Sequence, residues 1–181
     1  DNTRLRKAYN NSLQKITDYS TDLFQNSDLY LAYKQLHKSD AFKKLNSAQK
    51  KVIENTLRDF RLSGVSLKQN NKNEFKKVVT ALTKVESKFG ENVLDASHSW
   101  IKHITEKSAL AGLPETVITL ARKNAEDRKL QGWVVTLDFP SYFPIMQYAD
   151  STRLRREIYE AYVTRASNIG PGDHKFDNTS N

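Results

Sequence analysis

The sequence contains four histidines, and two of them, His98 and His103, lie close enough in the chain to suggest a metal site. A zinc pair on a helix needs histidines at positions i and i+4, which places both ring nitrogens on one face. These two are five residues apart. At about 100° per residue, their side chains would point roughly 140° apart in a continuous helix. We therefore expect surface or packing histidines, and no zinc site formed by this pair.

Paired carboxylates could act as general acid and base, and the sequence offers Glu86 with Glu91 and Glu157 with Glu160. Both pairs fall in stretches of helical pattern, where acidic residues at such spacings usually form a solvated surface. The chain has no Gly-x-Gly-x-x-Gly run, no phosphate-binding Gly/Lys loop, no Gly-x-Ser-x-Gly elbow and no cysteine. We assign no catalytic, cofactor-binding or metal-binding residue, and we name no substrate-binding residue.

Positive charge is the main bias of the composition, because 29 Lys and Arg residues face 21 acidic ones and give a net charge of +8. Such a surface can bind nucleic acid when aromatic residues add stacking. Here the basic clusters are short, spread along the chain and mixed with acidic residues, as on solvated helix faces. The neighbouring aromatic residues lie on apolar stripes and suit a core: Tyr30, Tyr33, Phe42 and Trp133. The pattern favours no nucleic-acid partner.

The sequence also bears on location. The longest apolar run is LYLAY at residues 29–33, far shorter than the roughly 20 residues of a membrane-spanning helix, so we expect no membrane partner. The absence of cysteine and of an apolar leader favours a cytoplasmic location.

The chain begins without Met and ends at 176–181 in residues typical of a helix start, so we expect a fragment of a longer protein.

Apolar residues recur at helical spacing along most of the chain. Between Asn46 and Gly64 the spacing predicts a helix with a capped start and a glycine end. A longer stripe predicts one helix over about 72–103, with Gly90 inside it as a point of kinking or close packing. The stripe comprises Phe75, Val78, Val79, Leu82, Val85, Phe89, Val93, Ala96, Trp100 and Ile104. Shorter stripes before residue 40 predict helical hairpins.

One stretch has the composition of a strand, WVVTL at residues 133–137. Its partner is either the region 101–105 or a segment outside this chain, because a single strand is not stable. Further helices are expected from Pro114 to about Leu130, at 141–148 and at 151–166. The predicted fold class is mostly α: helical hairpins and one long helix, with at most a small β-hairpin or short strand near 133–137.

Several segments, read in order, resemble the N-terminal part of the thimet-oligopeptidase-like zinc metallopeptidases. They are LRKAY (5–9), LNSAQKK (45–51), LRDFRLSG (57–64), NVLDA (92–96), GLPE (112–115), TLDFPSYFPIM (136–146) and YEAYVTRAS (159–167). The resemblance covers nearly the whole chain in collinear order, which makes the combination specific although each segment alone is weak.

The resemblance implies a parent enzyme that hydrolyses short peptides, with zinc held by a helix-borne His-Glu-x-x-His pair and a further Glu. Zinc lowers the pKa of its bound water and polarises the scissile carbonyl. The motif is absent from this sequence. In the family it lies downstream of the segments quoted above, so no zinc ligand is transferred to any position here. We expect this chain alone to bind no zinc and to be inactive.

The resemblance further implies two halves that face each other across a deep, narrow channel. Residues 1–150 would be the N-terminal helical domain and 151–181 the start of the segment leading into the catalytic domain. The chain would form one channel wall, with short peptides and the missing C-terminal catalytic half as partners. The turn at 140–144 is predicted to have a packing role.

The residues alone leave two other functions open. One is a free-standing basic helical interaction module without catalytic activity, which would bind a peptide, a partner helix or an acidic ligand. The other is a nucleic-acid binder, whose affinity would fall steeply as salt rises.

Overall fold

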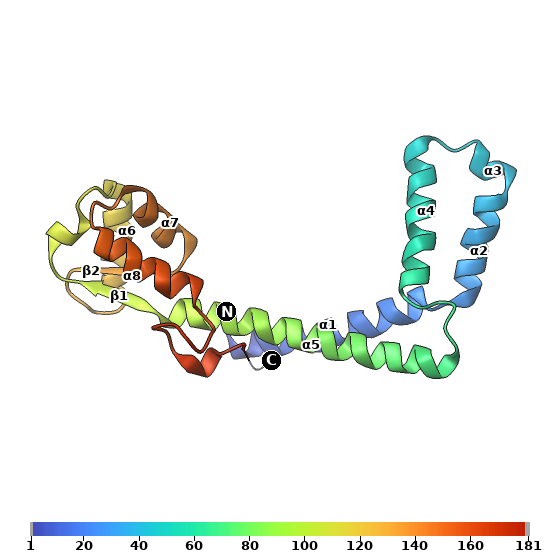
Figure 1. Ribbon diagram of the computed structural model, residues 1–181, viewed down its shortest axis with the longest axis horizontal. Coiled ribbons are helices and arrows are strands. Elements are labelled where there is room, and N and C mark those ends of the chain that lie inside the picture. Colours follow the sequence, from blue (N-terminus) through green and yellow to red (C-terminus); the bar gives the residue numbers. More distant parts are fainter. Residues whose placement is uncertain (1, 180–181) are drawn as a thin grey trace. The chain divides into compact units, whose positions relative to one another are not determined.

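The computed structural model describes residues 2–179. They form two compact units that divide between residues 87 and 88, here called the N-terminal unit and the C-terminal unit (Figure 1). Most described residues are helical, and the only sheet among them has two strands, which confirms the predicted mostly α class. No described helix is both long enough and apolar enough to cross a membrane.

The N-terminal unit consists of helices only. They are α1 (Thr3–Phe24), α2 (Ser27–Lys38), α3 (Asp40–Lys43), α4 (Ser47–Leu62) and the first part of α5 (Gln69–Ser99). Each of the first four begins at a side-chain cap, supplied by Asn2, Asn26, Ser39 and Asn46. These side chains accept hydrogen bonds from backbone N–H groups that have no partner within the helix.

Helix α4 has the predicted ends. Asn46 Oδ1 accepts from the Gln49 N–H at 2.9 Å, and Gln49 Oε1 accepts from the Asn46 N–H at 3.1 Å, which closes a capping box. The helix ends at Leu62, two residues before Gly64, whose φ of +80° favours glycine. The start near Asn46 and the stop at Gly64 are therefore confirmed.

The core of the N-terminal unit is centred on Phe60, which is 1% exposed. Its ring lies 5.3 Å from the ring of Phe24 and 5.7 Å from those of Tyr30 and Tyr33, measured between centroids. Tilted pairs at these distances gain from both burial and ring geometry. Helices α1, α2 and α4 thus meet at one side chain.

Helix α5 differs from its prediction at both ends. It covers 69–99 instead of about 72–103, because residues 101–104 form a strand. The backbone of residues 101–104 forms hydrogen bonds with the predicted strand at 133–136. The helical part of the apolar stripe therefore ends near Trp100. A Cβ at Gly90 would meet nothing within 4 Å, so the close packing considered there is not found.

The two strands of the C-terminal unit pair antiparallel. Strand β1 (Ile101–Ile104) lies beside β2 (Trp133–Thr136), with Ile101 opposite Thr136 and Ile104 opposite Trp133. The first of the two partners considered for the predicted strand is therefore the right one. Gly132 precedes β2 with a φ of +92°, and a Cβ there would come within 2.4 Å of the Ile104 carbonyl oxygen.

Helices cover this small sheet. They are η1 (Lys107–Leu110), α6 (Glu115–Glu126), α7 (Phe139–Tyr148), α8 (Thr152–Val163) and η2 (His174–Phe176). Helix α6 packs on β2, and α7 packs on α6, β2 and α8. The fully buried side chains of Val135, Ile145 and Ile158 bring β2, α7 and α8 into one core.

The helices of the C-terminal unit end earlier than predicted where the backbone turns left-handed. Helix α6 stops at Glu126 and not near Leu130, since Lys129 has a φ of 58° and the Leu130 N–H returns to the Ala125 carbonyl. Helix α8 stops at Val163, and Ala166 has a φ of 56°. The segment 176–181 lies partly outside the described residues; within them, the Asp177 carboxylate accepts from the Thr179 N–H at 2.8 Å.

Candidate functional site

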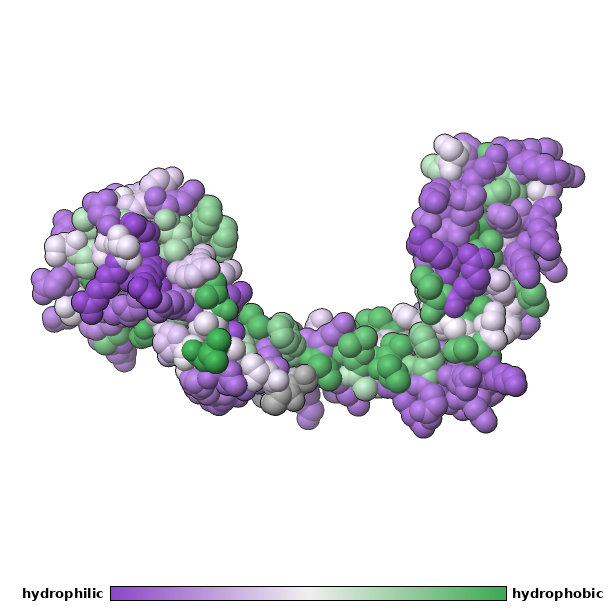
Figure 2. Space-filling view, in the orientation of Figure 1, coloured by the Kyte–Doolittle hydropathy of each residue, from purple (hydrophilic) through white to green (hydrophobic). Residues whose placement is uncertain are grey.

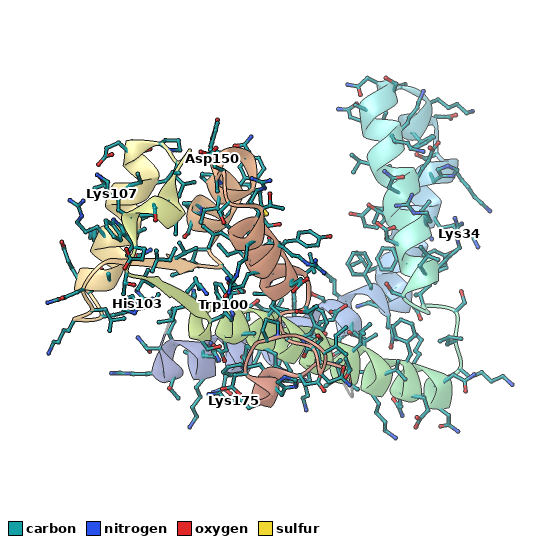
Figure 3. All side chains as sticks on the ribbon, turned by 60° about the vertical axis from the view of Figure 1, so that its left-hand side comes forward. Lys34, Trp100, His103, Lys107, Asp150 and Lys175 are labelled. Atoms are coloured by element: carbon teal, nitrogen blue, oxygen red, sulfur yellow. The ribbon has the colours of Figure 1, made fainter. Side chains whose placement is uncertain are left out.

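The clearest candidate for ligand contact is a shallow cleft of about 270 Å³ in the C-terminal unit. It lies between the segment of β1 and η1 on one side and the first turn of α8 on the other. Its lining is Lys102, His103, Ile104, Thr105, Glu106, Ala109, Ser151, Arg153, Leu154 and Glu157. Figure 3 shows His103 on β1 and Trp100 just before that strand.

An ion pair joins the two sides of the cleft. Lys102 Nζ on β1 lies 2.7 Å from Glu157 Oε1 on α8, and each side chain is about one-third exposed. Helix α8 is held at its start by Ser151, whose hydroxyl accepts from the Leu154 N–H at 3.2 Å. Arg153 and Glu106 are exposed at the cleft, and neither has an ion-pair partner among the described residues. These charged and hydroxyl groups can form hydrogen bonds and ion pairs with a polar ligand.

The histidines contact separate partners. His98 Nε2 lies 3.8 Å from Asp138 Oδ1, and His103 Nε2 lies 2.6 Å from the carbonyl oxygen of Gln131. The first is near the end of α5, and the second is on β1. Within residues 2–179 no group of three or more His, Asp and Glu side chains could hold a metal ion. The described residues therefore do not fit a zinc site.

The carboxylates of the α8 pair are both bound to cations. Glu157 pairs with Lys102, and Glu160 Oε1 lies 2.9 Å from Arg156 Nε. Both carboxylates thus have a cationic partner on the surface of the protein. The other pair, Glu86 and Glu91, is on α5 five residues apart. The structure brings neither pair into an enclosed site.

A cluster of aromatic rings lies where α7 meets α8. The rings of Tyr142 and Tyr162 stack with centroids 3.9 Å apart, and the Arg165 guanidinium lies 3.9 Å from the Tyr162 centroid. Burial, with a smaller contribution from Tyr162, raises the pKa of Tyr142. A second stack, Phe139 on Phe143 at 4.9 Å, stays exposed to solvent. The sequence analysis missed this stack; the i, i+4 spacing of the two phenylalanines is the signal that could have revealed it.

Residues 140–144, expected to form a turn, lie within helix α7, and their contacts support the expected packing role. Ser141 is buried, and its hydroxyl accepts from the Thr136 N–H at 3.1 Å, which ties the start of α7 to the end of β2. Pro140 lies in the first turn of α7, where its missing N–H costs no hydrogen bond. These contacts fix the direction in which α7 leaves the sheet.

Some of the basic residues pair with acidic residues nearby. Surface pairs include Lys43 with Asp40, Lys51 with Glu54, Lys76 with Asp22, and Lys77 with Glu74. The aromatic residues considered for base stacking are used in packing. Tyr30 and Tyr33 contact Phe60, Phe42 lies 4.5 Å from His37, and Trp133 packs on the core of the C-terminal unit.

Comparison with known proteins gives collinear similarity to one group of peptidases. Residues 1–72 match the family model described as Neurolysin/Thimet oligopeptidase, N-terminal domain. The chain is 43% identical over 175 residues to Oligopeptidase A of Escherichia coli (strain K12), which covers 97% of this chain and 26% of that protein.

The alignments with two further relatives span 99% of this chain and 26% of the length of each relative. Oligopeptidase A of Haemophilus influenzae (strain ATCC 51907 / DSM 11121 / KW20 / Rd) is 44% identical over 179 residues. A probable cytosolic oligopeptidase A of Arabidopsis thaliana is 34% identical over 187 residues. The chain thus spans about a quarter of the length of the curated relatives it matches.

Proposed function

We propose that this chain, which corresponds to the N-terminal portion of an oligopeptidase A-like peptidase, forms a non-catalytic wall of the substrate channel in a zinc-dependent endopeptidase. The whole enzyme would hydrolyse short peptides in the cytoplasm. The observation that carries the proposal is the similarity to oligopeptidase A along 97% of the chain. It supports a shared role for the entire chain and not for a single motif.

The local chemistry supports a binding role over a catalytic one. The cleft beside β1 is lined by charges of both signs, of which Lys102 and Glu157 are already paired. Such a surface offers hydrogen bonds and charges to peptide termini and carbonyls without selecting one side chain. Zinc, which would activate water for hydrolysis, belongs in this proposal to the part of the enzyme outside residues 1–181.

The domain division is part of the proposal. We assign residues 1–150 to the N-terminal helical domain and 151–181 to the segment leading into the catalytic domain. The two compact units divide between residues 87 and 88 instead. That division follows packing within this chain, whereas the proposed boundary follows the resemblance.

The test compares residues 1–181 with the full-length protein on a quenched fluorescent peptide. We expect cleavage by the full-length protein, its loss on adding a zinc chelator and its return with added zinc. The chain of 181 residues should show no cleavage while circular dichroism reports its helices. Chelator-sensitive cleavage by a pure sample of residues 1–181 would contradict the assignment of zinc elsewhere.

A second experiment separates this proposal from a free-standing interaction module. Sequencing the native transcript past residue 181 should reveal an in-frame His-Glu-x-x-His followed by a further Glu. A stop codon directly after residue 181 would instead favour the interaction module.

A further inference from the structure

Helix α5 carries a row of apolar side chains that stay about half exposed among the described residues. Val78, Leu82, Val85 and Phe89 follow one another at i, i+4, i+7 and i+11, which places them on one face of the helix. Their exposed fractions are between 45% and 64%. The hydrophobic side chains along α5 are visible in the space-filling view (Figure 2).

Helix α1 carries a second exposed row, and it runs antiparallel to the first part of α5. The row comprises Leu5, Tyr9, Ile16 and Tyr19, with 61–69% of each exposed. The direction follows from two side-chain hydrogen bonds. Ser87 Oγ lies 2.8 Å from Asn10 Oδ1, and Thr17 Oγ1 lies 3.5 Å from Thr83 Oγ1.

The two rows lie on the same side of the α1–α5 pair. At about 100° per residue, the angle around each helix axis between the apolar row and the residues that contact the other helix is roughly 125–140°. Because the two helices run antiparallel, these angles place both rows on the same side of the pair. The ion pair of Lys76 with Asp22, 2.7 Å, lies on the opposite side. The N-terminal unit therefore has one polar side and one apolar side along this pair.

The combined surface is larger than a monomer ordinarily exposes. Eight large side chains, each about half exposed, amount to on the order of 700 Å², against roughly 300–600 Å² for the largest patch of a typical monomer. We call this surface, made of the two rows just named, the α1–α5 face. Its size is that of one side of a stable interface.

Charges of both signs flank the row along α5. Lys77, Lys84 and Lys88 each precede a residue of the row by one position, about 100° around the helix from it, and the exposed Glu86 follows Leu82 by one turn. These charges do not select the sign of an occupant. The exposed row itself requires an occupant with an apolar face.

We infer that the α1–α5 face is the docking surface for an amphipathic helix supplied by the polypeptide that follows residue 181 in the full-length protein. This inference rests on the proposed function, because the chain spans only about a quarter of its relatives' length and most of the protein is left to supply the cover. The helix completes the core of the N-terminal unit.

The absence of cysteine from the chain allows a direct test by single-cysteine labelling. Leu82→Cys lies within the face, and Val52→Cys on α4 is the matched control, since Val52 is also more than half exposed. Each variant is prepared as residues 1–181 and as the full-length protein. The rate of maleimide modification at the introduced cysteine is followed by mass spectrometry of its peptide.

We expect residue 82 to react at least about tenfold more slowly in the full-length protein than in residues 1–181, because a covered site reacts only through local opening. Residue 52 should react at similar rates in both. Equal rates at residue 82 would overturn the inference, and so would equal slowing at both positions. Protection of residue 82 that grows with the concentration of residues 1–181 would point to a second copy and would also overturn it.

Peptide cleavage measured on the same samples reports the proposed function separately, since residue 82 can be covered in a protein without peptidase activity.

Discussion

The two units of the chain are similar in length but differ in how much apolar surface they bury. Among the described residues, the N-terminal unit has four buried apolar side chains, Ile53, Leu57, Phe60 and Val65, and the other seventeen lie in the C-terminal unit. Conversely, the long exposed apolar rows are on α1 and α5. In the C-terminal unit, helices pack on a sheet and close a core, whereas the N-terminal unit pairs helices and leaves one side open.

This difference shows that helical periodicity alone does not produce a closed core. Each helix of the N-terminal unit has an apolar stripe, yet a stripe is buried only where another element lies against it. Around Phe60 three helices converge, and along α1 and α5 only two do. The stability of the N-terminal unit should therefore depend on few side chains, and that dependence can be measured.

The largest effect is expected from Phe60→Ala. The change removes the ring that α1, α2 and α4 share, at about 3–5 kcal/mol, and few other buried side chains remain to hold this unit. Hydrogen exchange should show α2 and α4 losing protection while α6 and α8 keep theirs. Val52→Ala in the same helix is the control, because Val52 is exposed. Loss of protection in both units would show that they unfold as one.

A similar or slightly smaller loss, about 2–5 kcal/mol, is expected from Ile158→Ala in the C-terminal unit. Ile158 is fully buried in the core formed with Val135 and Ile145. Because this core is larger, the unit should stay folded at room temperature and unfold at a lower denaturant concentration. Val163→Ala at the exposed end of α8 should change the unfolding free energy little. If Ile158→Ala unfolded the C-terminal unit completely, this unit would not tolerate the loss of a buried side chain better than the N-terminal unit does.

The cap of α4 should have a smaller effect. Asn46→Ala removes the acceptor of the Gln49 N–H and opens the capping box, which should cost about 1 kcal/mol. Denaturant unfolding followed by circular dichroism measures the change. Asn46→Asp retains an acceptor oxygen and should restore most of the stability. An unchanged midpoint in Asn46→Ala would indicate that α4 is held by packing at Phe60 alone.

The smallest effect concerns pH. Burial raises the pKa of Tyr142, so the folded state favours the neutral phenol. In the unfolded chain the phenol ionises near its ordinary pKa of about 10. This contribution to stability is therefore complete below about pH 10 and is lost as the pH rises through the pKa of the folded state. Tyr142→Phe should remove this part of the pH dependence, whereas Tyr148→Phe, at an exposed position, should retain it.

Local features of the fold could be predicted from particular residues. Asn46 and Gly64 mark the ends of α4, and Pro114 directly precedes α6. The β-branched residues of 133–136 indicate a strand. The exact ends of α6 and α8 could not be predicted, because they depend on positive φ values at Lys129 and Ala166, residue types with no strong preference for that conformation.

The candidate cleft was not predictable, for a different reason. Lys102 and Glu157 are separated by 55 residues, and their ion pair exists only because β1 and α8 come together in space. The argument about His98 and His103 assumed one continuous helix, whereas α5 ends at Ser99 and a strand begins at Ile101.

The sequence by itself determined the type of most elements and, through its collinear segments, the relationship to peptidases. Both depend on local information, since caps, turns and stripes act within a few residues of one another. The tertiary structure alone decided which stripes become core and which remain exposed. The stripe of Phe60 is buried by α1 and α2, whereas the stripe of Leu82 faces solvent. Periodicity fixes the direction of a side chain around its own helix, and burial requires a second surface that the helix does not specify.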